Sequence, residues 1–131
     1  TIFGQAVDTK YPSVMYFEKR NGEWQMVFFT YFELPVDPPS IAVKKDYLKA
    51  FTGLYEVSPE LIFEVGASDT ALVYKKVNSA GAGTVLYPID NNGRFFRAGT
   101  ESEFIFEKDN QGRSIVRQRR NWIDFIWYKK P

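Results

Sequence analysis

Turn signals recur at short intervals along the chain and limit most regular segments to between five and nine residues. They are clusters of Gly, Asn, Asp, Ser and Pro at 21–22, 58–59, 67–69, 79–83, 91–93, 99–100 and 109–112. An Asn-Gly pair favours a hairpin turn because both residues tolerate positive φ. The runs between the turns are rich in Phe, Tyr, Trp, Val and Ile, which favour strands. Many short strands spaced in this way indicate an antiparallel meander that forms a barrel or a sandwich.

The pattern predicts ten strands and one short helix. The strands are expected near 14–19, 24–33, 53–57, 61–66, 71–78, 84–89, 94–98, 102–107, 113–119 and 122–129. The helix is expected over 43–51, where Tyr47, Leu48 and Phe51 are at helical spacing and Gly53 can end the helix. The predicted fold class is therefore mainly β, with an antiparallel meander forming a barrel.

Three prolines within five residues divide the chain. Pro35, Pro38 and Pro39 cannot all pair within a sheet, and they stiffen the segment into an extended spacer. We therefore expect three parts. They are a β-hairpin piece at 1–34, a proline-rich linker at 35–42 and a β-barrel at 43–131.

Cysteine and histidine are both absent from the 131 residues. Their absence removes thiol nucleophiles, Cys or His metal clusters, the usual haem ligands and every triad that uses an imidazole. Acid–base catalysis would need carboxylates, Lys or Tyr with strongly shifted pKa values. No such constellation stands out, so we expect no catalytic residue, no metal site and no cofactor.

The charges are nearly balanced, with 17 basic and 16 acidic residues mixed along the chain and a net charge of +1. A protein dedicated to nucleic acid normally carries a basic excess, so we expect no nucleic-acid partner. No apolar run approaches the roughly 20 residues that a membrane-spanning helix needs. We therefore expect no membrane span.

Two parts of the chain resemble known families. The run KRNGEWQMV at 19–27 resembles the final hairpin of SnoaL-like domains, members of the nuclear transport factor 2-like superfamily. The remainder is similar to a lipocalin-like module that follows such domains in uncharacterised bacterial proteins and is also appended to serine β-lactamase-like hydrolases. Its matching positions are Asp37-Pro38-Pro39, Tyr47-Leu48, Phe51, Gly53, Tyr55-Glu56, Leu86, Pro88, Phe96, Phe104, Phe106, Asp109, Gly112, Arg119-Arg120, Asp124 and Trp127.

The resemblance implies a lipocalin-like barrel next to the end of a different domain. Only about the last 34 residues of a SnoaL-like domain would be present. The pocket that gives such domains enzymatic activity lies outside this portion, so no catalytic residue is carried over. The resemblance slightly favours an exported location, periplasmic or extracellular. The composition itself gives no information about location.

Several predicted strands are apolar on both faces, for example 122–129 and 85–87. A barrel with one face in water alternates more cleanly. One interpretation is an interior cavity for an apolar ligand, and the other is a filled core with an outer face that a partner covers. A small eight-strand barrel is either just filled by side chains or holds one small ligand, and the many bulky residues favour filling. In the cavity interpretation the predicted lining is Phe63, Tyr74, Phe96 and Trp127, with Arg117 as a polar anchor.

Asp124 is a carboxylate in an otherwise apolar strand. A half-buried carboxylate needs a guanidinium partner, most simply Arg117 or Arg119 across the hairpin. The favoured interpretation is a structural ion pair of Asp124, Arg117 and Arg119, and the alternative is an anchor for a ligand carboxylate.

Three hypotheses about function follow. The leading one is a non-catalytic accessory barrel that packs against its own missing N-terminal domain or a second subunit. The second is a barrel that binds a small apolar ligand. The third is the C-terminal part of a SnoaL-like enzyme, in which a catalytic domain absent from this chain performs the reaction.

Overall fold

The computed structural model describes residues 13–31, 37–120 and 123–131. These residues form one helix and ten strands, which match the predicted strands within a few residues at each end. The elements are β1 (Ser13–Arg20), β2 (Glu23–Tyr31), α1 (Lys45–Lys49), β3 (Gly53–Ser58), β4 (Leu61–Ala67), β5 (Leu72–Lys76), β6 (Thr84–Pro88), β7 (Arg94–Phe96), β8 (Glu103–Lys108), β9 (Ser114–Arg120) and β10 (Ile123–Lys129). The structure does not describe positions 32–33 and 122 of the predicted strands. Nor does it describe residues 1–12 and 32–36 of the predicted hairpin and linker.

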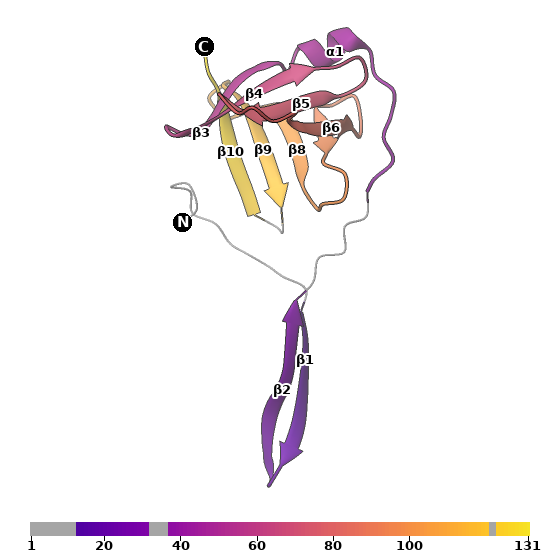
Figure 1. Ribbon diagram of the computed structural model, residues 1–131, viewed down its shortest axis with the longest axis vertical. Coiled ribbons are helices and arrows are strands. Elements are labelled where there is room, and N and C mark those ends of the chain that lie inside the picture. The colour runs from indigo at the N-terminus through magenta and orange to yellow at the C-terminus, as the bar shows by residue number, and fades with distance from the viewer. Residues whose placement is uncertain (1–12, 32–36, 121–122) are drawn as a thin grey trace.

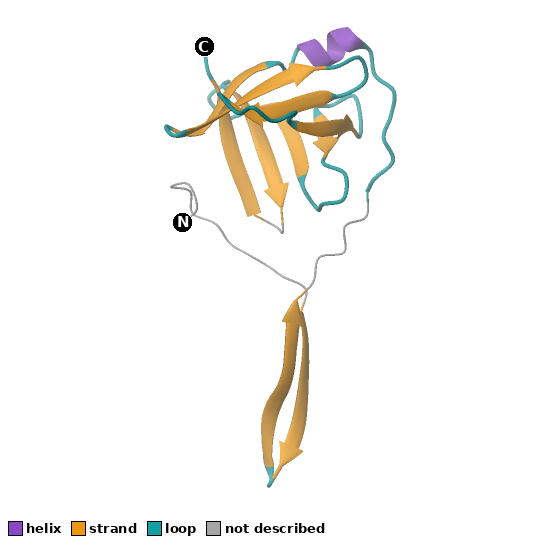
Figure 2. Ribbon diagram, in the orientation of Figure 1, coloured by secondary structure: helices purple, strands orange, loops and turns teal. Residues whose placement is uncertain are grey.

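Strands β3 to β10 form a closed barrel in which each strand is antiparallel to its neighbour along the chain. The barrel closes where Tyr128 and Lys129 of β10 pair with Glu56 and Tyr55 of β3. Strands β1 and β2 form a separate two-stranded sheet. Figures 1 and 2 show the barrel, its one short helix and the hairpin. The predicted fold class is therefore confirmed.

Aromatic rings fill the middle of the barrel. Alternate residues of a strand point to opposite faces, and one of the two sets points inward. Among the largest fully buried side chains are Trp127, Tyr55, Phe95 and Phe104. The core cluster also contains Val65, Leu72, Tyr74, Leu86, Phe106 and Val116. Burying this many large apolar side chains is the main stabilising contribution to the barrel.

Helix α1 packs over one end of the barrel. Leu48 is fully buried, and Tyr47 and Phe51 pack against the core. The ring of Phe51 lies 5.6 Å from that of Phe95 and 5.0 Å from that of Phe106. The helix begins later than the predicted residue 43 because Lys44 has extended backbone angles, φ −74° and ψ 144°.

The described part of the proline-rich linker is attached to the barrel. The backbone N–H of Ile41 donates to the carbonyl of Pro88 at 3.0 Å, and the Ser40 hydroxyl donates to the same carbonyl at 3.2 Å. The carboxylate of Asp37 accepts a hydrogen bond from the N–H of Gly99 at 2.8 Å. From Asp37 onward, this segment is therefore held to the barrel by hydrogen bonds at two places.

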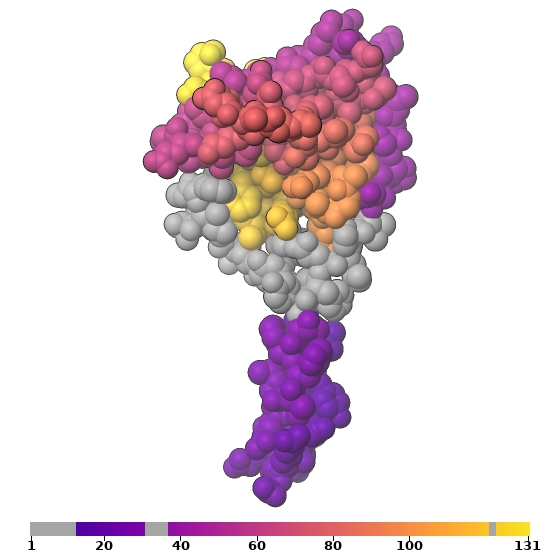
Figure 3. All heavy atoms as spheres, in the orientation of Figure 1, coloured from indigo at the N-terminus to yellow at the C-terminus, as the bar shows by residue number. Residues whose placement is uncertain are grey.

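The β1–β2 hairpin turns at Asn21 and Gly22, whose φ angles are 50° and 83°. Positive φ at both positions is the geometry that the Asn-Gly pair predicts. Residues 13–16 pair with 31–28, and after a register shift Phe17 pairs with Met26. Val27 is left as the extra residue of a β-bulge. In Figures 1 and 3 the hairpin extends away from the barrel.

Candidate functional site

One face of the hairpin is apolar over most of its length. Cross-strand partners share a face, so the register groups five large side chains on the same side. We call this surface the hairpin face. Its residues and their exposed fractions are Met15 (53%), Phe17 (47%), Trp24 (69%), Met26 (57%) and Phe29 (55%). The register also places one charged residue, Lys19, on this face.

The opposite face of the hairpin is polar toward the turn. Arg20 and Glu18 form an exposed ion pair at 2.8 Å, and Gln25 belongs to the same face. Nearer the ends of the strands, Tyr16 and Phe28 on this face are 55% and 52% exposed. The two faces therefore differ most near the turn, where only the hairpin face is apolar.

The structure brings together three of the five residues predicted to line a ligand cavity. The rings of Phe63 and Trp127 stack at 4.6 Å, and the Tyr74 ring lies 5.4 Å from Phe63 and 5.3 Å from Trp127. The indole N–H of Trp127 donates to the Gln118 side-chain carbonyl at 3.2 Å. These rings pack against one another inside the barrel.

Phe96 and Arg117 lie elsewhere. Phe96 pairs with Tyr87 and Glu103, which occupy the outer face of the sheet, and its ring lies 5.6 Å from that of Tyr87. Arg117 also belongs to the outer face, where Ile105 and Ile126 are its cross-strand partners. The five predicted residues therefore do not form one site.

Asp124 lies beside both predicted guanidinium groups on the outer face of β9 and β10. Arg119 donates two hydrogen bonds to its carboxylate, at 2.8 and 3.0 Å, and Arg117 donates one at 3.4 Å. Arg117 also binds Glu107 at 2.7 Å. The hydrogen bonds from Arg119 hold the pKa of Asp124 below its usual range, although partial burial opposes this shift. Asp124 is therefore part of a network of ion pairs on the outer face of the sheet, with Arg119, Arg117 and Glu107.

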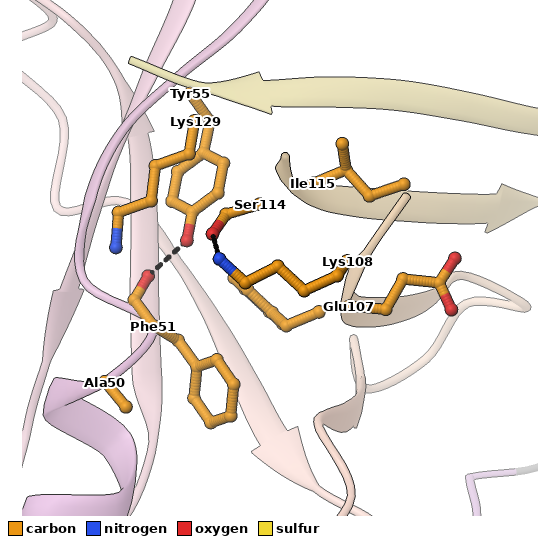
Figure 4. A pocket seen from close by; sticks show the side chains of 9 residues that line it. Ala50, Phe51, Tyr55, Glu107, Lys108, Ser114, Ile115 and Lys129 are labelled. Atoms are coloured by element: carbon orange, nitrogen blue, oxygen red, sulfur yellow. Dashed lines mark hydrogen bonds between the residues drawn. The ribbon is translucent and has the colours of Figure 1, made fainter. Parts of the chain in front are cut away.

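A second candidate site lies at the barrel end near the C-terminus of α1, and we call it the end pocket (Figure 4). Its volume is about 290 Å³. It is lined by Ala50, Phe51, Tyr55, Phe106, Glu107, Lys108, Ser114, Ile115 and Lys129.

Polar groups surround the apolar floor of the end pocket. The Tyr55 hydroxyl donates to the Phe51 carbonyl at 2.8 Å, and the ammonium of Lys108 donates to the Ser114 hydroxyl at 2.7 Å. The Lys129 Nζ lies 5.8 Å from the centre of the Tyr55 ring. Burial raises the pKa of Tyr55 to about 12, so its hydroxyl keeps its proton at neutral pH.

The sequence interpretation missed both the hairpin face and the end pocket. The hairpin face depends on the register shift beside Phe17, which the alternation of residues alone does not reveal. The end pocket has a visible signal, because Lys108 and Lys129 each follow an inward-facing aromatic residue, Phe106 and Trp127, by two positions. A lysine at an inward position near the end of a barrel strand indicates a polar rim.

Comparisons with protein-family models, with curated proteins and with solved structures gave no match. Within the described residues no cluster of three or more Asp or Glu side chains is arranged to hold a metal ion. None of the described residues belongs to a helix that is long and apolar enough to cross a membrane.

Proposed function

We propose that this chain is a non-catalytic accessory module that associates with a second copy of itself through the hairpin face. The observation that carries the proposal is the exposure of Met15, Phe17, Trp24, Met26 and Phe29 on one side of a two-stranded sheet. An exposed apolar patch of this kind typically marks a protein interface.

The low stability expected of an isolated hairpin supports the presence of a partner. An isolated two-stranded hairpin is marginally stable in water unless a third strand or another surface covers its apolar face. The residues of β1 are almost all exposed, on both faces of the hairpin. Covering the hairpin face would stabilise the hairpin and remove the apolar side chains from water.

The size of the hairpin face suits a second copy. Five large side chains that are about half exposed offer on the order of 100 Å² each. Two copies packed face to face would then bury about 1,000 Å², which is near the minimum for a biological interface and typical of a weak, transient one. The face carries Lys19 as its one charged residue, so two copies can meet without burying a row of like charges.

Size-exclusion chromatography with light scattering tests this proposal. The wild-type chain should approach twice the 15.2 kDa of one chain as its concentration rises to about 200 μM, because interfaces of this size are usually transient. Phe29→Glu should keep the protein monomeric. Phe28→Glu is the matched control, because Phe28 is similarly exposed but lies on the opposite face. A wild-type monomer over the whole range would contradict the proposal, as would equal effects of the two variants.

A second candidate partner is a SnoaL-like domain of the same protein. The resemblance of residues 19–27 to the final hairpin of such domains supports it, together with the Asn-Gly turn geometry. In that arrangement the barrel would be a lipocalin-like module beside a domain that performs any catalysis. The intact mass of the natural protein tests this candidate, which requires a mass well above that of the present chain.

A further inference from the structure

The end pocket has two inward-facing lysines and no carboxylate to neutralise them. Lys108 pairs with Ser114 across β8 and β9, and Lys129 pairs with Tyr55 across β10 and β3. Lys108 and Lys129 take part in no ion pair among the residues that the structure describes, although ion pairs are frequent elsewhere on the barrel.

The one acidic residue of the end pocket does not supply the missing charge. The carboxylate of Glu107 accepts hydrogen bonds from the guanidinium of Arg117 at 2.7 and 2.9 Å. In Figure 4 this carboxylate points away from the pocket, whereas the ammonium groups of Lys108 and Lys129 lie on either side of the Tyr55 hydroxyl. The positive charge at this end of the barrel is therefore available to an anion.

The floor beneath the ammonium groups is apolar. The rings of Phe51 and Phe106 lie 5.0 Å apart, and the Tyr55 ring meets Phe106 edge to face at 5.8 Å. The Tyr55 hydroxyl already donates its hydrogen bond to the carbonyl of Phe51. An inorganic anion would use only the charges of this pocket, whereas an organic acid would also cover the exposed part of the floor.

We propose that the end pocket binds a small organic acid with an aryl or short alkyl body. Its carboxylate lies between the ammonium groups of Lys108 and Lys129, and its apolar part lies against Phe51 and Phe106. The pocket volume of about 290 Å³ is below the usual range of about 300 to 1,000 Å³ for drug-sized ligands, which limits the acid to a small one. This site is separate from the hairpin face and does not depend on self-association.

The full chain is titrated with three probes while NMR follows the backbone amides. The probes separate recognition of the charge from recognition of the apolar body. The probes are 3-phenylpropionate, which has both the charge and the apolar body, acetate, which has the charge, and 3-phenylpropanol, which has the body. The acid should shift the amides of Lys108 and Ser114 and saturate at a concentration at least about tenfold lower than the other two. The alcohol loses a charge-assisted contact, and acetate loses the burial of the apolar body. Equal binding of the three probes would overturn the proposal, as would shifts confined to other parts of the barrel.

Substitution of the lysines tests the role of their charges. Lys108→Met and Lys129→Met keep an apolar side chain of similar length, and each should weaken binding of 3-phenylpropionate about tenfold. Lys44→Met, an exposed site outside the pocket, is the control and should bind like wild type. Raising NaCl from about 20 to about 500 mM should weaken binding of the acid to wild type but not that of the alcohol. This salt comparison decides the matter even if a variant does not fold, and salt-independent binding of the acid would refute the proposal.

Discussion

One hydroxyl group adds hydrogen bonds to the apolar packing that holds α1 on the barrel. The Tyr47 hydroxyl accepts a hydrogen bond from the backbone N–H of Gly93 at 2.8 Å and donates one to the carbonyl of Asp90 at 3.3 Å. Gly93 is buried in the β6–β7 turn, so water cannot replace the lost partner easily. Tyr47→Phe keeps the ring and its contact with Phe51 but leaves the Gly93 N–H without an acceptor.

The expected cost of Tyr47→Phe is about 1 to 3 kcal/mol, the usual penalty for a buried donor left unsatisfied. For a barrel of this length the melting temperature should fall by about 4 to 8 °C for each kcal/mol. Urea unfolding followed by circular dichroism measures the change. Tyr87→Phe is the control, because Tyr87 is 38% exposed and its hydroxyl can remain hydrated in wild type. A Tyr47→Phe variant as stable as the control would refute the role given to this hydroxyl.

Two further substitutions test the barrel. Gly93→Ala should destabilise the barrel by at least about 2 kcal/mol in urea unfolding, because Gly93 has φ 83° and an added Cβ would meet the Phe106 carbonyl oxygen. A loss below about 0.5 kcal/mol, the level of an ordinary surface substitution, would contradict this account. Asp124→Asn should cost about 1 kcal/mol at pH 7 by weakening the ion pairs with Arg119 and Arg117. Because the pKa of Asp124 is lowered in the folded state, its contribution is present above its ordinary pKa of about 3.9 and is lost as the pH falls through the folded-state value. Wild type and Asp124→Asn should therefore converge in stability in strong acid, and a constant difference down to pH 2 would exclude this linkage.

The strands could be predicted from the sequence because turn residues and β-favouring runs alternate so regularly. Asn21 and Gly22 specify the hairpin turn, and Tyr47, Leu48 and Phe51 specify the helix. The strand face of each side chain was harder to predict, because several strands are apolar on both sides. Phe96, for example, lies on the outer face beside Tyr87, while its neighbour Phe95 is in the core.

The candidate sites depend on pairing between distant strands, which a single sequence does not specify. The end pocket forms because barrel closure pairs β10 with β3 and so brings Lys129 beside Tyr55. The hairpin face requires the bulge at Val27, which places Met26 opposite Phe17. A one-residue change of register would move the apolar side chains to the other face.

The most direct test of self-association is the concentration dependence of thiol accessibility on the two faces of the hairpin. The chain contains no cysteine, so Met26→Cys and Gln25→Cys each introduce a single thiol, the first on the hairpin face and the second on the opposite face. The rate of reaction with a maleimide is measured for both variants from dilute to concentrated protein. The proposal predicts that the thiol at position 26 becomes protected as the concentration rises, while the thiol at position 25 keeps its rate. Equal rates that do not change with concentration would show that the hairpin face stays in water and would contradict the proposal.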